Sequence, residues 1–242
     1  LYIFFENYKY PLAIQIKKPN MLQEGRIVWI NTPKAVASTK AREQGPKEHK
    51  PRFVNPYEVE IIREFLENFS IFSKKEIDPQ NIENTRYNLA ILSPYTHQVR
   101  LLNSELRQTK LPKNIELKES LTKNRLKYES NYLRVAHTVD SFQGNEADII
   151  IVSLVRNNYG FSEFTNPLGF LSDFRRLNVL LSRAQRLLVL VGSWDFFWSI
   201  VRNKEQFNDI GANNIRTAFS LLDDWFRTGK AVKIDIEDIK NR

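Results

Sequence analysis

The sequence predicts an α/β fold built on a mostly parallel sheet with helices on both faces. Short, continuous apolar runs rich in β-branched residues alternate along the chain with segments whose apolar residues recur at helical spacing. Strands that are apolar along their whole length are typical of parallel sheets, because both faces of such sheets are covered. Of the 242 residues, 42% are hydrophobic, which is enough for one sizeable core. We therefore expect one domain with additions.

The first strand is predicted over Gly25 to Thr32, a β-branched and aromatic run that ends at Pro33. Residues 34–52 are rich in Lys and Arg, so they predict a surface loop that could touch phosphates. A helix follows, because Asn55 is a good N-cap and Pro56 suits the first helical position. Its apolar residues at helical spacing are Val59, Ile62, Leu66 and Phe69.

A βα unit is predicted next, with a strand over Tyr87 to Ser93 and a helix that begins after Pro94. Residues 110–131 are basic and poor in periodicity, which indicates an insertion or a long crossover connection. The apolar runs Leu133 to Val139 and Ala147 to Val155 predict two more strands that are covered on both faces.

Helices and strands continue to alternate toward the end of the chain. Ser172 or Asp173 can cap a helix that is predicted to run through Arg186 and to lead directly into a strand over Leu187 to Gly192. The remaining predicted elements are helices over 194–201 and 215–227 and a possible strand over 231–236.

Three regions are predicted along the chain. The sequence starts at Leu1 rather than at Met, so residues 1–25 are expected to be a linker that enters from an upstream domain. Residues 26–203 are expected to form the main domain, with its basic loop at 34–52 and its insertion at 110–131. Residues 204–242 are expected to form a C-terminal helical extension.

The composition excludes several classes of protein. The formal charge of +8 favours a polyanionic partner such as nucleic acid. The chain has no cysteine and three histidines without close spacing, so we expect no disulfide framework and no metal site. No run approaches the roughly 18 apolar residues of a membrane span, and no secretory signal begins the chain, so we expect no membrane contact and an intracellular, cytoplasmic or nuclear, location.

The polar turn between Thr138 and Asp148 is the first candidate site, because ligands of open α/β sheets bind beyond the carboxyl ends of strands. Gly144 allows a phosphate or sugar to approach the backbone, and Thr138 and Ser141 offer hydroxyl groups to phosphate oxygens. Glu146 can accept from ribose hydroxyls. The alternative interpretation is a polar connection with an exposed glutamate.

Two further stretches offer groups that bind anions or bases. On a continuous helix, Arg176, Arg183 and Arg186 would project from nearly one face, and guanidinium groups suit the charge that develops on a transferred phosphoryl group. Ser93 and the residues after it join a strand to a helix N-terminus, where backbone N–H groups can bind an anion and Tyr95 can stack on a base. The alternatives are a solvated basic helix face and a tyrosine that only covers the core.

These stretches resemble motifs IV, V and VI of superfamily 1B helicases in the senataxin and nonsense-mediated-decay group. Their order along the chain and their positions at strand–helix junctions match as well, and the resemblance covers roughly residues 26–193. The matching sequences are Ser93-Pro-Tyr-x-x-Gln98, Val139-Asp-Ser-Phe-Gln-Gly-Asn-Glu146 and Arg175-Arg-Leu-Asn-Val-Leu-Leu-Ser-Arg-Ala184.

The resemblance implies a RecA-like second motor domain that closes over ATP held mainly by a partner domain. It makes Arg183 the arginine finger on the γ-phosphate and Glu146 the residue that holds the ribose, while Gln185 departs from the arginine that many relatives carry. The residues on the nucleotide side are Gln143, Gly144 and Glu146. The residues on the nucleic-acid side are Ser93, Pro94, Tyr95, Thr138 and Ser141.

Other motifs of an ATPase are missing from the sequence. It contains no G-x-x-x-x-G-K-[ST] loop and no clear Asp-Glu pair after a strand, so ATP and Mg²⁺ are expected to be bound mainly by an upstream RecA-like domain of the same protein. This chain alone should not hydrolyse ATP. The other expected partner is single-stranded DNA or RNA, between which the sequence does not distinguish.

Three functions remain open at this stage. The first is a translocating helicase motor, favoured because motifs V and VI occur together. The second is a catalytically inactive helicase-like module that binds nucleic acid. The third is a nuclease, which is disfavoured because no carboxylates cluster at metal-binding spacing.

Overall fold

The structure is a computed structural model that describes residues 12–16, 21–24, 27–34, 53–73, 87–107, 109–111, 115–117, 136–157, 169–203 and 210–236. The strands are β1 (Leu12–Ile16), β2 (Met21–Glu24), β3 (Ile27–Asn31), β4 (Phe69–Ser73), β5 (Tyr87–Ser93), β6 (Ile115–Leu117), β7 (Ala136–Thr138), β8 (Ala147–Ser153), β9 (Ala184–Gly192) and β10 (Ala231–Asp235). The helices are α2 (Pro56–Asn68), α3 (Thr96–Glu105), the 3-10 helix η1 (Gly169–Ser172), α4 (Phe174–Leu181), α5 (Trp194–Arg202) and α6 (Ile210–Arg227). Most of the predicted basic loop and insertion lies outside the described residues.

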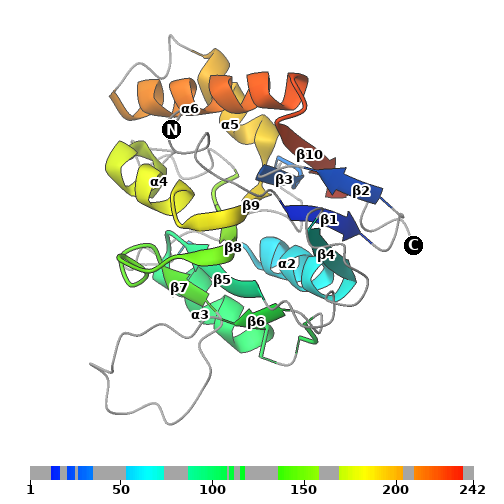
Figure 1. The fold of residues 1–242 in the computed structure, drawn as a ribbon. Coiled ribbons are helices and arrows are strands. Elements are labelled where there is room, and N and C mark those ends of the chain that lie inside the picture. The colour runs from blue at the N-terminus through cyan, green and yellow to red at the C-terminus, as the bar shows by residue number, and fades with distance from the viewer. Residues whose placement is uncertain are drawn as a thin grey trace.

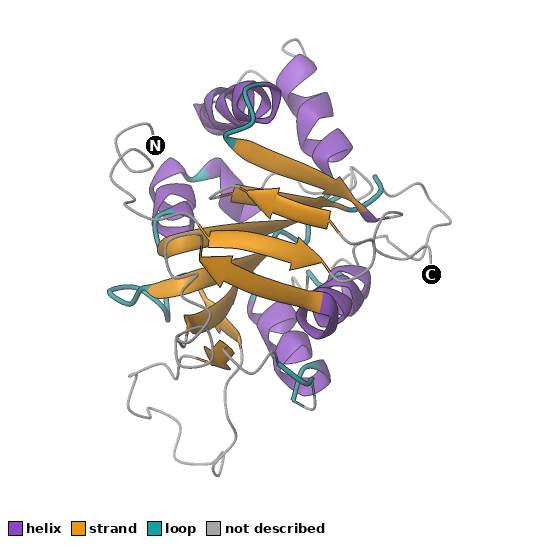
Figure 2. Cartoon of the chain, turned by 45° about the vertical axis from the view of Figure 1, so that its right-hand side comes forward, coloured by secondary structure: helices purple, strands orange, loops and turns teal. Residues whose placement is uncertain are grey.

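The main sheet has seven strands in the order β10-β3-β9-β8-β5-β6, with β7 also paired to β5. Every one of these pairings is parallel. Figures 1 and 2 show this sheet as a central layer between helices. A separate three-stranded antiparallel sheet, β2-β1-β4, includes two strands from the segment predicted as a linker. The predicted α/β parallel sheet with helices on both faces is confirmed.

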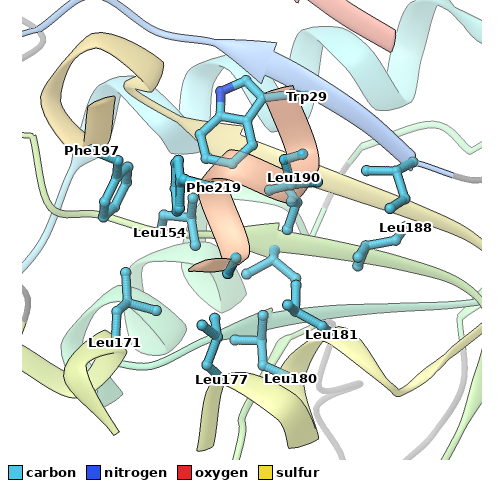
Figure 3. Close-up of a cluster of buried hydrophobic side chains, with 14 of the residues drawn as sticks. Trp29, Leu154, Leu171, Leu177, Leu180, Leu181, Leu188, Leu190, Phe197 and Phe219 are labelled. Carbon is cyan, nitrogen blue, oxygen red and sulfur yellow. The ribbon is translucent and has the colours of Figure 1, made fainter. Parts of the chain in front are cut away.

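The central strands of the main sheet send alternate side chains to two separate cores. Trp29, Leu188 and Leu190 face the core beneath η1, α4, α5 and α6, which is drawn in Figure 3. Val28 and Val189 face the core beneath α2 and α3. Because both faces of the strands are buried, the continuous apolar runs in the sequence correspond to central strands.

The last described segment belongs to the same core. Phe219 and Trp225 on α6 pack beneath the sheet with Trp29, and β10 adds a parallel strand to β3 from Ala231 to Asp235. Residues 204–242 were predicted as a helical extension after the main domain. The described part of that segment instead completes one layer of helices and one edge of the sheet.

Several predicted elements differ from the structure. The helix predicted through Arg186 ends at Leu181, because Ala184 already pairs with the start of β8. Phe69 was assigned to the apolar stripe of a helix, but it begins β4 and pairs with Ile16 of β1. Within the basic stretch 110–131, Ile115–Leu117 forms the edge strand β6 beside β5. In each case strand pairing overrides the local sequence signal.

Candidate functional site

The predicted site residues lie at two opposite edges of the main sheet. Parallel strands place all their carboxyl ends at one edge, and here that edge carries Ser93, Thr138 and Ser153 at the ends of β5, β7 and β8. Glu146 and Arg183 directly precede β8 and β9, so they lie at the amino edge. β8 has seven residues, and at about 3.3 Å per residue it separates the two edges by about 20 Å.

This arrangement corrects one prediction. The turn from Thr138 to Asp148 was placed as a whole beyond the carboxyl ends of the strands. Only its start lies there. Because β8 runs parallel to β5, the chain must return to the amino edge before β8 begins, and this return carries Glu146 to the opposite side of the sheet from Thr138.

The return segment is a compact turn with its own hydrogen bonds. Thr138 Oγ1 accepts from the N–H of Ser141 at 3.1 Å, and the Ser141 hydroxyl donates to the carbonyl of Thr138 at 3.0 Å. Phe142 is fully buried and fastens the turn to the core. A hydroxyl has one proton, so Ser141 uses its donor inside the turn, whereas Thr138 accepts there and keeps its proton for an outside acceptor.

The amino-edge cluster consists of Arg183, Glu146 and Gln185. The Nε of Arg183 donates to the carbonyl of Val179 at 3.0 Å, and its Nη1 donates to the carbonyl of Asn145 at 3.4 Å. Gln185 Nε2 donates to Glu146 Oε2 at 3.0 Å. The guanidinium has five N–H donors, so donors remain for an anion that approaches this edge. The cluster therefore places a cation beside a carboxylate that can accept from hydroxyl groups.

The glycine and glutamine of the same turn are exposed. Gly144 has φ +82°, and no atom lies within 4 Å of a Cβ built on it. Glycine is therefore favoured here by backbone conformation and not by a close contact within this chain. Gln143, beside it, is exposed to solvent.

The three arginines of the predicted helix do not share one face. Arg176 is exposed on α4, with its Nε 3.7 Å from Asp173. Arg186 lies on β9 instead of a helix and forms an ion pair with Asp148 at 3.1 Å. Arg183, in the turn between α4 and β9, is the one that lies beside the end of the return turn.

At the carboxyl edge, the structure separates the roles of Ser93, Pro94 and Tyr95. Ser93 is fully buried, and its hydroxyl accepts from the N–H of Tyr95 at 3.4 Å. Pro94 and Tyr95 are partly exposed. The ring of Tyr95 lies 5.2 Å from the ring of Phe53, and Arg156 covers Phe53 with its guanidinium carbon 4.5 Å from the ring centre. Pro94 and Tyr95 can thus reach a ligand, while the Ser93 side chain faces inward.

A buried polar network beneath this edge was missed by the sequence analysis. It joins Asn55, Glu58, Gln98, Ser153 and Val155, each with 0% of its surface exposed. The Asn55 side chain accepts from the N–H of Glu58 at 3.3 Å, which confirms the predicted N-cap of α2. The spacing Asn-x-x-Glu before an apolar helix is the sequence signal that could have identified the first two members.

Two kinds of feature are absent from the described residues. Among the parts of the chain that the structure describes, no group of three or more His, Asp or Glu side chains is arranged to hold a metal ion. Within the same ranges, no helix is long and apolar enough to cross a membrane.

Comparisons with known proteins agree with the motifs. A family model described as an AAA domain matches residues 8–195. The DNA polymerase alpha-associated DNA helicase A of Saccharomyces cerevisiae is 35% identical over 143 residues, which are 57% of this chain and 15% of that protein. The helicase sen1 of Schizosaccharomyces pombe is 38% identical over 86 residues, which are 35% of this chain and 5% of that protein. The matched part thus spans a small fraction of these relatives.

Proposed function

Because this chain belongs to the AAA domain family, and its relatives include helicases of the senataxin-like superfamily 1 group, we propose that it is the second RecA-like motor domain of an ATP-dependent helicase or translocase. Its substrate is single-stranded DNA or RNA. An upstream RecA-like domain of the same protein completes the active site. The proposed location is intracellular, in the cytoplasm or nucleus.

The observation that carries this proposal is that Arg183 and Glu146 occupy adjacent positions at the amino edge. Ala147 and Ala184 are partners in the β8–β9 register, so the residues just before them emerge side by side. A guanidinium suits the γ-phosphate of ATP, and a neighbouring carboxylate suits the ribose hydroxyls. Gln143 and Gly144 line the exposed turn next to them. The upstream domain holds most of the ATP and the Mg²⁺.

The carboxyl edge is the proposed path of the nucleic-acid strand. Thr138 has a hydroxyl proton to donate to a phosphate, and Pro94 and Tyr95 are partly exposed at the start of α3. Ser93 and Ser141 support this surface from within, through their hydrogen bonds to neighbouring backbone. The net charge of +8 favours phosphate binding over the whole chain.

Nucleic-acid-stimulated ATP hydrolysis by the full-length protein tests the proposal. Replacing Arg183 with alanine should lower turnover by about 10³ while ATP binding persists, because the finger acts on charge that develops during phosphoryl transfer. Arg227→Ala is the matched control, since its side chain on α6 is 70% exposed. Turnover that survives the loss of Arg183 would contradict the assignment of the finger.

The alternative function is a catalytically inactive module that binds nucleic acid. The network beneath the carboxyl edge favours this alternative, because that edge is organised by this chain alone. Oligonucleotide binding without any ATP turnover by the natural protein would support the inactive module and rule out the motor.

A further inference from the structure

The backbone after β8 is held in a strained turn. Val155 has φ +70°, a value that β-branched residues very rarely adopt, and the N–H of Arg156 donates to the carbonyl of Leu154 at 2.8 Å. A positive φ at the centre of such a three-residue hydrogen bond defines a γ-turn of the rare, strained kind. Strain of this sort persists where the surroundings hold the backbone in place, and it often marks functional positions.

The group that holds this turn is the buried carboxylate of Glu58. The N–H of Val155 donates to its two oxygens at 3.0 and 2.9 Å, and the Ser153 hydroxyl donates to Oε2 at 2.6 Å. The Asn55 amide donates to the carbonyl of Val155 at 3.1 Å. Both main-chain groups of the strained residue are therefore bound by α2 and the residue that caps it.

An exchange of hydrogen-bond partners allows the Glu58 carboxylate to bind this turn. In a capping box, the glutamate at the third helical position would bond to the backbone N–H of the cap. Here the N–H of Asn55 donates instead to Gln98 Oε1 at 2.8 Å, while Gln98 Nε2 donates to the carbonyl of Asn55 and to Ser153. Gln98 on α3 thus takes the place of Glu58 at the cap. The Glu58 carboxylate accepts from Ser153 and Val155 instead.

The turn determines where Arg156 lies. Its guanidinium covers the Phe53 ring. It also lies close to Gly169, where a side chain would place its Cβ 3.5 Å from Arg156 Nη1. The Tyr95 hydroxyl approaches Gly169 as well, since it would lie 2.8 Å from a Cβ at that position. The Tyr95 ring is tilted against the Phe53 ring. The chain of contacts runs from Glu58 through the γ-turn to the surface that carries Tyr95.

We propose that Glu58 is a positioning residue for nucleic-acid binding, which acts by holding the γ-turn at Val155 and, through Arg156 and Phe53, the partly exposed ring of Tyr95. This inference rests on the proposed function of the carboxyl edge. Glu58 has no role at the amino edge, so its loss weakens binding of a single strand and leaves ATP binding intact.

Binding measurements on the full-length protein test this role, with a fluorescent ATP analogue and with single-stranded oligodeoxythymidine and oligouridine as probes. Glu58→Gln keeps the volume of the side chain but replaces one accepting oxygen with a donor, so affinity for the oligonucleotide should fall about tenfold. Affinity for the ATP analogue should not change. Glu67→Gln, at an exposed position of the same helix, is the matched control.

A second substitution separates positioning from a general loss of stability. Glycine adopts a positive φ without strain, so adding Val155→Gly to Glu58→Gln should restore much of the lost affinity. If Glu58 only stabilised the fold, the smaller side chain would make the double variant worse. Ser153→Ala removes the 2.6 Å bond to Glu58 and the 2.9 Å bond from Gln98, but it keeps the bonds between Glu58 and the N–H of Val155. It should therefore give a weaker form of the same defect, which keeps the test informative if Glu58→Gln does not fold.

The outcomes distinguish this inference from the proposed function. A natural protein that binds neither probe would reject the motor assignment itself. A natural protein that binds both probes, with Glu58→Gln and Ser153→Ala variants of unchanged oligonucleotide affinity, would reject only the role of Glu58. Equal losses of affinity for both probes would also reject the role of Glu58. The same holds if oligonucleotide affinity does not recover when Val155→Gly is added to Glu58→Gln.

Discussion

The carboxyl and amino edges of the main sheet are organised in different ways. At the carboxyl edge, side chains from α2, α3 and β8 are fully buried and bonded to one another, and they hold a strained turn in place. At the amino edge, Glu146 and Gln185 are exposed, and Arg183 bonds to nearby carbonyls of its own chain. The carboxyl edge is therefore organised by buried contacts within this chain, while the amino edge leaves polar side chains exposed.

This contrast agrees with the proposal that the carboxyl edge binds nucleic acid and the amino edge binds ATP. A strand of nucleic acid binds through many phosphate contacts, which a preformed surface supports best. Phosphoryl transfer instead depends on bringing a finger to ATP when two domains close, so its residues must be reachable from outside. Strand β8 joins the two edges, with Glu146 before it and the γ-turn after it.

The largest expected difference concerns two helix caps, of which one is buried and the other is exposed. Asn55→Ala should destabilise the protein by about 3 kcal/mol, because it removes a cap and leaves the carbonyl of Val155 without its donor inside the core. Asp173→Ala should cost only about 1 kcal/mol, since that cap of α4 is exposed. Denaturant unfolding measures both, and Asp173→Asn, which keeps the capping oxygen, serves as a control. Equal losses at Asn55 and Asp173 would show that the buried network adds nothing to the stabilisation by the cap.

A smaller effect is expected for the carboxylate at the amino edge. Glu146→Gln should raise the apparent KM for ATP about tenfold with little change in kcat or in oligonucleotide affinity, because a charged acceptor for the ribose is lost. Steady-state kinetics measures this change in KM, and Glu105→Gln, at an exposed position at the end of α3, is the control. A loss confined to oligonucleotide affinity would move Glu146 to the nucleic-acid side.

The smallest effect is expected at Thr138. Thr138→Val keeps the shape of the side chain but removes both the acceptor for Ser141 and the outward hydroxyl proton. Affinity for an oligonucleotide should fall by about fivefold, the value of one hydrogen bond, while the KM for ATP stays constant. Titration with the oligonucleotide measures this change in affinity, and Thr217→Val, at an exposed position of α6, is the control. An altered KM with unchanged oligonucleotide affinity would show that Thr138 does not face the strand.

Most of the fold follows from the sequence, because its strands are apolar along their length. β5 spans Tyr87 to Ser93 as predicted, and the N-cap of α2 is Asn55 as predicted. The errors arose where pairing with a distant strand decides the outcome. Arg186 continues a helical pattern locally, yet the carboxylate of Asp148 on β8 and the ladder of β9 place it in a strand.

The positions of the predicted site residues follow from the sequence only in part. Glu146 and Arg183 emerge at adjacent positions, but the rule that ligands bind at carboxyl ends concealed their location at the opposite edge. The network of Glu58 joins residues up to 100 positions apart. Local patterns predict the cap of α2, but they carry no information about which distant backbone group a buried carboxylate will meet.

Hydrogen–deuterium exchange of the full-length protein tests the central claim, that the two edges hold different ligands. A nonhydrolysable ATP analogue should slow exchange of backbone amides at 144–146 and 183–185, and a single-stranded oligonucleotide should slow exchange at 95–98 and 138–141. Each ligand alone should leave the opposite edge largely unprotected. Protection of the same edge by both ligands would contradict the account.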